Sequence, residues 1–340
     1  MGMQRLAGLR LLSESKSYID ALHSVLSHSG LYPCPTYMLA GMTACAFRFT
    51  VDRRLTAVSP TAYNWMAENF LAADFIGVTS SQQAGFSFEP AFPLYQNEAI
   101  YAIKESIDRG IGAIIWKDQF VVVTGYDDAR QVLFYSDGTE SADSAGIPQV
   151  HDQAIGLELP YAQFGRNVSP YWYYQILEER IELDERQIYH ESFMQAIYKW
   201  ETHDLMLPED EYACGKMAYS AIIEALETGC FDKAGAYSVI DTYAAAKRDL
   251  ACYTQRLEQI WPQSRFVAAR YAELKQVYEQ ILIVTANAFH DQPEAAETVL
   301  IRHLADLFQQ ALDIENEAIQ SMKRLMRETV GNRFNDIGLR

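Results

Sequence analysis

Thiols are the first side chains in this sequence that could act as nucleophiles or metal ligands. There are five cysteines, and they are Cys34, Cys45, Cys214, Cys230 and Cys252. Their odd number and wide spacing fit neither a disulfide framework nor the ligand spacing of a zinc site. A reducing cytoplasm is therefore the expected location. Cys34 and Cys45 are either candidate nucleophiles or small buried apolar residues, which is the usual role of a free cysteine.

Histidines paired with carboxylates are the second set that could do chemistry. His190 and Glu191 resemble the start of a metal-binding helix, but no histidine follows at position i+4. The C-terminal half also lacks the inward Glu-x-x-His spacing that holds a di-iron site. We therefore expect neither a metal nor a cofactor.

Residues 112–138, GAIIWKDQFVVVTGYDDARQVLFYSDG, predict the elements that would position a site. Apolar runs indicate strands at 113–116, 120–124 and 132–135, the first two buried on both faces. The segment 125–128 has the composition of a hairpin turn. Upstream, the apolar spacing over 97–108 predicts an amphipathic helix that stops at Gly110. The sequence thus predicts a helix that leads into a buried antiparallel sheet.

The run 119–127, QFVVVTGYD, resembles a motif of the papain-like cysteine peptidase and acyltransferase superfamily. Within that superfamily, the run is similar to bacteriocin-leader peptidases and to the N-terminal domain of butirosin-H-type acyltransferases. The resemblance implies an α+β papain-like domain in which a histidine opens this strand. An acidic residue after the third strand would orient that histidine. Here Gln119 stands at the histidine position, and Asp137 stands at the acidic one.

The same resemblance places the nucleophile at the start of an earlier helix, where the positive helix dipole lowers a thiol pKa. Aligning Ala21, Leu22 and Gly30 with the family pattern puts that position at Ser17. The alternative is that Ser17 caps the helix, because Ser17 and Asp20 match a capping box. A serine beside Gln119 has no obvious base, since an amide cannot take up a proton near neutral pH.

The function implied by the resemblance is transfer of an acyl group from a carrier-protein thioester, or cleavage of a Gly-Gly bond. Because two catalytic positions are replaced, the first interpretation is a catalytically degenerate domain that binds a peptide, acyl or carrier-protein ligand. Such a protein would suit a secondary-metabolite cluster. The second is an active acyltransferase or amidohydrolase that uses Ser17 or a cysteine. The third is a scaffold whose helices mediate dimerisation. The aromatic segment 80–96 either lines a groove or packs as a flap over the core.

The C-terminal half has the periodicity of helices alone. Apolar stripes predict helices at 217–226, 236–260, 266–288 and 294–326, with a single gap at Lys247. Four such helices with short loops predict an up-and-down bundle. The predicted domains are therefore a papain-like domain at 1–205 and an all-α helical bundle at 206–340, which is the order found in butirosin-H-type proteins.

The amino-acid composition of the chain limits the classes of partner that it is expected to bind. The chain has 340 residues, is 49% hydrophobic and carries a net charge of −17. That acidity disfavours nucleic acids and anionic membranes, which bind basic surfaces. No segment is long and apolar enough to predict a membrane span. The expected partner is a small-molecule, peptide or acyl-carrier ligand, and a homodimer is left open.

Overall fold

The structure, a computed structural model, describes residues 2–139, 156–289 and 294–338. Its contacts divide the chain into two compact units. The first unit comprises Met1–Leu39 and Trp65–Leu183, and the second comprises Ala40–Asn64 and Asp184–Arg340. The segments 40–64 and 184–205 therefore pack with the C-terminal helices. The predicted folding domains 1–205 and 206–340 stay a prediction, because a division by contacts does not test which segments fold alone.

An antiparallel sheet forms the centre of the first unit. Its strand order is β3-β8-β4-β5-β6-β7, and β1 pairs with one end of β5. The strands are β1 (Met3–Arg5), β3 (Val78–Phe86), β4 (Ala113–Trp116), β5 (Phe120–Asp127), β6 (Val132–Ser136), β7 (Leu157–Pro160) and β8 (Tyr171–Arg180). The prediction of helices combined with an antiparallel sheet is confirmed.

The three central strands form where the apolar runs predict them, and β4 has the predicted bounds. The predicted hairpin forms between β5 and β6, but its turn follows Asp127 and does not occupy 125–128. Residues 125–127 stay in the strand because they pair with β6 on one side and with β1 on the other. A side chain at Gly125 would lie 2.5 Å from the Gln4 carbonyl oxygen, so this glycine permits close backbone approach and does not make the turn.

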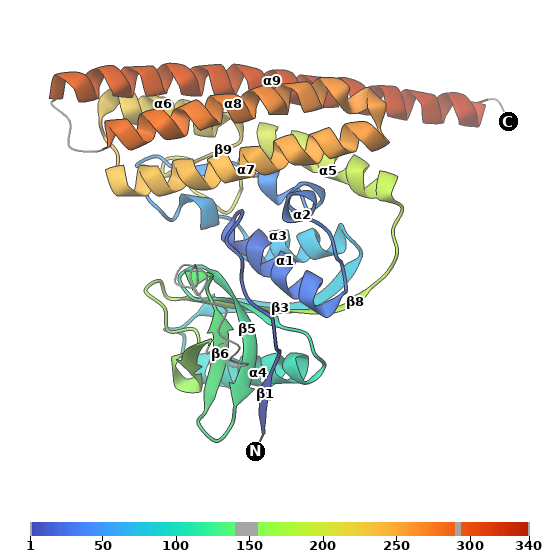
Figure 1. The fold of residues 1–340 in the computed structure, drawn as a ribbon, viewed down its shortest axis with the longest axis vertical. Helices are drawn as coiled ribbons and strands as arrows, with labels where there is room; N and C mark the ends of the chain where they lie inside the picture. The colour runs from blue at the N-terminus through green and yellow to red at the C-terminus, as the bar shows by residue number, and fades with distance from the viewer. Residues whose placement is uncertain (1, 140–155, 290–293, 339–340) are drawn as a thin grey trace, which may run out of the picture. The chain divides into compact units, whose positions relative to one another are not determined.

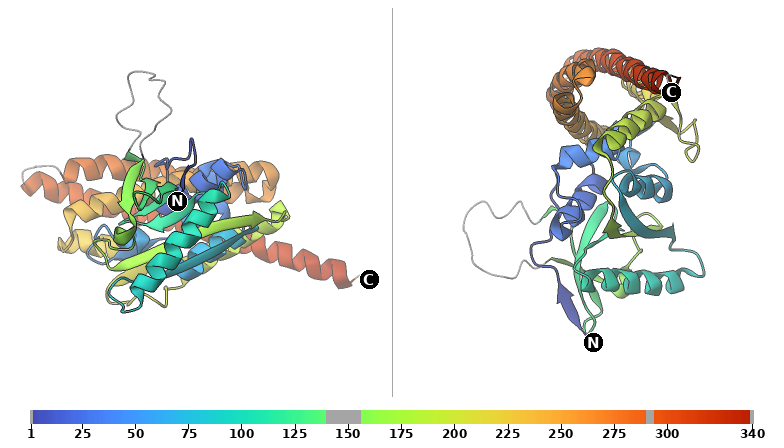
Figure 2. Two further views of the ribbon diagram at one scale, coloured as in Figure 1. Left: turned by 90° about the horizontal axis from the view of Figure 1, so that it is seen from below. Right: turned by 90° about the vertical axis from the view of Figure 1, so that its right-hand side faces the viewer.

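Helices cover both faces of this sheet (Figure 1). Helix α4 (Phe92–Asp108) packs on one face, where its Ile103 joins Val121 and Tyr174 in a core cluster. Helices α1 (Ser17–Ser29) and α3 (Trp65–Asp74) lie on the other face, and Figure 2 shows α4 and α1 from two further sides. The sheet is therefore buried on both sides, as the continuous apolar sequences of β4 and β5 require.

The aromatic segment 80–96 is not a single loop. Its first part is β3, the edge strand that pairs with β8, and its last part opens α4. A polar strand such as VTSSQQAGF lacks the alternation of apolar and polar residues on which strand prediction relies. Phe92 is buried under the sheet, and the ring of Tyr95 stacks on Trp172 at 5.7 Å between centroids.

The second unit contains the four helices that the periodicity predicts, together with α5 (Glu185–Glu201). The four are α6 (Lys216–Thr228), α7 (Lys233–Ile260), α8 (Arg265–Ala288) and α9 (Glu294–Gly338). Helix α8 packs against both α7 and α9, and α6 packs against α9, as a bundle requires (Figure 1). The prediction that this part is entirely helical is wrong. Strand β9 (Tyr212–Cys214) pairs with β2 (Thr50–Asp52), which lies far earlier in the sequence.

The remaining helical segments are short. Among the described residues they are α2 (Thr36–Met42) and 3₁₀ turns at Cys45–Phe47, Ser59–Thr61, Tyr161–Gln163 and Pro262–Ser264. Within the described ranges, no helix combines the length and the apolar character needed to cross a bilayer.

Candidate functional site

Ser17 is the first residue of α1, and Lys16 occupies the N-cap position. The capping-box prediction is wrong, because the Asp20 N–H, from which Ser17 was expected to accept a hydrogen bond, donates to the Lys16 carbonyl oxygen at 3.0 Å. The Asp20 carboxylate instead accepts hydrogen bonds from the backbone N–H groups of Glu14 and Ser15, at 3.2 and 2.9 Å. Asp20 therefore fixes the loop that enters the helix. Within residues 2–139, 156–289 and 294–338 the Ser17 hydroxyl has no hydrogen-bond partner.

Gln119 and Asp137 lie together, but not as an orienting pair. Gln119 ends the tight turn between β4 and β5, and its Nε2 donates to the backbone carbonyl of Asp137 at 3.2 Å. The Asp137 carboxylate accepts from the Thr139 N–H and hydroxyl, at 3.0 and 2.7 Å. The amide of Gln119 therefore has a fixed place beside the end of β6, while the carboxylate of Asp137 is used locally.

The neighbours of Ser17 and Gln119 are in direct contact. The Tyr18 ring lies edge-on to the Phe120 ring, with centroids 5.3 Å apart. The Tyr18 hydroxyl donates to the side-chain oxygen of Gln175 and lies 3.0 Å from the Asn69 carbonyl oxygen. The start of α1 is thus fixed beside the start of β5. Ser17 itself makes no hydrogen bond with Gln119 or Asp137 among the described residues.

The thiol of Cys34 lacks the surroundings of an activated nucleophile. Burial raises the pKa of Cys34 to about 11, so this thiol is protonated near neutral pH. His23 Nε2 lies 2.8 Å from the backbone carbonyl oxygen of Cys34, and this contact does not involve the sulfur. Cys45 and Cys214 are buried, whereas Cys230 is exposed. No group of three metal-ligating side chains occurs in the described part of the chain.

Aromatic rings form a continuous path from the Tyr18–Phe120 contact to the surface of the first unit. The ring of Trp65 contacts both Phe120 and Trp116, with centroids 5.3 and 4.5 Å away. Trp65 also contacts Tyr171 at 5.8 Å, and Tyr171 contacts Phe86 at 5.2 Å. Phe86 in turn stacks on Phe88 at 5.1 Å.

The outer end of this path is open to solvent. Phe86, Phe88 and Tyr171 are 37%, 71% and 45% exposed. We call Trp65, Phe86, Phe88 and Tyr171 the ring surface. Clustered exposed aromatic side chains commonly mark a binding surface. The aromatic residues in 80–96 are a partial signal of this surface in the sequence, but Trp65 and Tyr171 come from distant elements.

The second unit contains a buried ion pair. Lys247 Nζ donates to both oxygens of Glu315, at 2.6 and 2.7 Å, and both side chains are at most 2% exposed. Glu315 also accepts from the hydroxyls of Tyr219 and Tyr271, at 2.6 and 3.3 Å. The carboxylate thereby accepts four hydrogen bonds from three groups, which is its full capacity. Such a satisfied cluster fixes helix packing and leaves no lone pair for a ligand.

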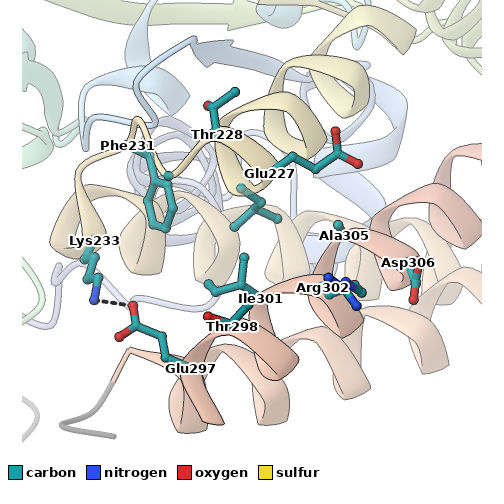
Figure 3. Close-up of a pocket in the computed structure, with 12 residues that line it drawn as sticks. Glu227, Thr228, Phe231, Lys233, Glu297, Thr298, Ile301, Arg302, Ala305 and Asp306 are labelled. Atoms are coloured by element: carbon teal, nitrogen blue, oxygen red, sulfur yellow. Dashed lines mark hydrogen bonds and ion pairs between the residues drawn. The ribbon is translucent and has the colours of Figure 1, made fainter. Parts of the chain in front are cut away.

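A pocket of about 720 Å³ opens between the end of α6, the start of α7 and α9 (Figure 3). Its wall carries charges of both signs, including Lys233, which pairs with Glu297, and Arg302. A second hollow of about 600 Å³ lies between α7 and α8. Neither pocket is lined by Ser17, Gln119 or Asp137.

Comparisons with known proteins supply no family for this chain. Neither a family model nor a curated protein matches it.

Proposed function

We propose that this chain is a catalytically degenerate papain-like protein that binds an apolar acyl chain at the ring surface without transforming it. The observation that carries the proposal is the path of rings. It begins with Tyr18 and Phe120, which adjoin Ser17 and Gln119, and it ends at exposed Phe86 and Phe88. The residues at the three resembling positions support the loss of catalysis, since the Ser17 hydroxyl is hydrogen-bonded to no base among the described residues and the Gln119 amide cannot transfer protons.

The acyl chain is favoured over a peptide because the ring surface consists of four neighbouring aromatic side chains, three of which are exposed. The free energy gained by burying aromatic and methylene surface depends on the buried area and not on direction. A flexible hydrocarbon chain can therefore bind such a surface in many conformations. A secondary-metabolite cluster and a reducing compartment, where thioesters are handled and cysteines stay free, would be consistent with this ligand.

The test is a titration with acyl-pantetheine thioesters of increasing chain length, followed by tryptophan fluorescence. Each added methylene should tighten binding about fourfold, because its burial contributes about 0.8 kcal/mol. Trp65→Phe should abolish most of the signal change. Trp261→Phe is the matched control, since Trp261 stacks on Phe193 in the second unit. Binding that does not depend on chain length would argue for a peptide ligand.

The same samples separate binding from catalysis. Mass spectrometry should recover the thioester intact after incubation with the protein. Release of free pantetheine, lost in Ser17→Ala, would instead establish the alternative of an active acyltransferase or hydrolase. No binding of any thioester would leave the third interpretation, a dimerisation scaffold.

A further inference from the structure

The pocket of about 720 Å³ in the second unit is lined by side chains from 226–233 and 297–306, and we call it the α9 pocket. Its charged side chains fall into two groups. At one end Lys233 pairs with Glu297 at 2.5 Å. At the other end lie Glu227, Arg302 and Asp306, and within the described ranges none of these three side chains makes an ion pair or a hydrogen bond. Figure 3 shows the two groups on opposite sides of the pocket.

Arg302 is the cation of the unpaired group. The chain has 45 acidic residues against 28 lysines and arginines, so carboxylate partners for a cation are abundant. Asp306 lies one turn further along α9, at a spacing where oppositely charged side chains commonly pair on a helix. The two side chains nevertheless form no ion pair in the described part of α9. The guanidinium therefore keeps its fork of N–H donors, which matches the geometry of a carboxylate, for a ligand.

An apolar strip joins the two ends of the α9 pocket. Leu226 and Ala305 are buried in its wall, and Ile301 is partly exposed between the two charged groups (Figure 3). Phe231 lies at the paired end and is also partly exposed, and its ring centroid is 5.6 Å from that of Phe289. Positions 297 and 302 are roughly 7.5 Å apart along the axis of α9. The strip is therefore about as long as an aromatic amino-acid side chain.

We propose that the α9 pocket binds an α-amino acid with an aromatic side chain, in its zwitterionic form. The ligand carboxylate pairs with Arg302, its ammonium lies between Glu227 and Asp306, and its ring covers Ile301 and reaches Phe231. A simple anion would be repelled by the two carboxylates and a simple cation by the guanidinium, whereas a zwitterion complements both. The volume is in the range of small-molecule sites. This proposal is independent of acyl binding, which concerns the first unit.

The test is a ligand-observed NMR titration of the full chain with L-phenylalanine and with analogues that each lack one feature. L-phenylalaninamide lacks the carboxylate and N-acetyl-L-phenylalanine lacks the ammonium. Each should bind at least about tenfold more weakly than L-phenylalanine, because a charge-assisted hydrogen bond is lost. L-alanine keeps both charges but should also bind at least about tenfold more weakly, because it lacks the ring. The proposal would be overturned if L-phenylalanine showed no saturable binding at millimolar concentration, or if any of the three analogues bound equally well.

Arg302→Gln tests the partner assigned to the ligand carboxylate. It should weaken binding of L-phenylalanine at least about tenfold but should not weaken binding of L-phenylalaninamide, which has no carboxylate. Arg256→Gln is the matched control and should change neither, because Arg256 is an exposed residue of α7 outside the α9 pocket. Undiminished binding of L-phenylalanine by Arg302→Gln would place the ligand elsewhere and overturn the proposal. The analogue series uses the unaltered chain and therefore decides even if Arg302→Gln misfolds.

Discussion

The ring of Tyr18, at the start of α1, lies edge-on to the ring of Phe120, at the start of β5, with centroids 5.3 Å apart. Such edge-to-face pairs stabilise a contact beyond the area that they bury. The pair joins the two segments on which the papain-like resemblance depends. It also turns the side chain of Phe120 toward α1, while Val121 faces α4.

Removing the Tyr18 hydroxyl tests how much this junction contributes to stability. In Tyr18→Phe the buried side-chain oxygen of Gln175 loses its donor. We expect a loss of about 1–3 kcal/mol in the free energy of unfolding, because an unsatisfied buried acceptor pays its full desolvation cost. Urea unfolding measures it. Tyr237→Phe, at an exposed tyrosine of α7, is the control and should change stability little; equal effects would contradict the assignment.

The stripe of α7 shows both what the sequence could predict and what it could not. Apolar spacing identified the helix, and its one gap, Lys247, is the residue that pairs with Glu315 in the core. The sequence shows that Lys247 interrupts the apolar stripe, but it does not identify the partner of Lys247, because Glu315 is 68 residues away on α9. Likewise, the pairing of β2 with β9 cannot be predicted from the local sequence pattern of either strand. Local periodicity specifies elements, whereas pairing of distant polar groups depends on tertiary packing.

The site was predictable to a lesser degree than the fold. The capping box at Ser17 failed because Asp20 binds the preceding loop, a choice that the four-residue pattern does not distinguish. Gln119 and Asp137 were expected to be neighbours, and they are. The contact, however, joins the Gln119 side-chain amide to the backbone carbonyl of Asp137 and not to its carboxylate. The ring surface needed Trp65, Phe86 and Tyr171 to meet across three elements, which only the sheet order brings about.

Breaking the Lys247–Glu315 pair should be costly, and removing both partners should cost less. Lys247→Met alone leaves a buried carboxylate without its cation, for which we expect a loss of about 3–5 kcal/mol. The double variant Lys247→Met, Glu315→Leu should recover part of that loss. Urea unfolding of both variants provides the comparison. Lys233→Met, which breaks an exposed pair with Glu297, should cost under about 1 kcal/mol. An additive double variant would show that the two groups do not interact.

Alkaline pH should destabilise the second unit. Burial raises the pKa values of Tyr219, Tyr271 and Tyr278 well above the ordinary 10.0. The folded state therefore keeps protons that the unfolded state releases, and stability falls as pH rises past 10 but is unaffected well below it. Urea midpoints on both sides of pH 10 test this. As pH rises, tyrosinate absorbance should increase in two phases, first from the exposed tyrosines and then from the buried tyrosines as the protein unfolds. A single phase at the ordinary tyrosine pKa would contradict the prediction.

Thiol labelling should follow exposure and not catalytic activation. With the pKa of Cys34 near 11, its reaction with an alkylating reagent should be slow at neutral pH and rise about tenfold per pH unit. Exposed Cys230 should react first. Peptide mapping after timed alkylation gives both rates. Fast, selective modification of Cys34 at neutral pH would instead indicate an activated nucleophile and support the enzyme alternative.

The alignment of Ser17 with the nucleophile and Gln119 with the histidine can be tested by restoring both. Ser17→Cys places a thiol at the start of α1, where the helix dipole favours the thiolate. Adding Gln119→His should lower the pKa of that thiol by a further unit or more if an imidazolium lies beside it, because an opposite charge at close range stabilises the thiolate. The measurement is the alkylation rate against pH for Ser17→Cys with and without Gln119→His, in a background lacking Cys230. A shift of the rate profile toward lower pH in the double variant would support the papain-like alignment. Superimposable profiles would show that the contact of Tyr18 with Phe120 brings the two segments together without the geometry of a catalytic pair.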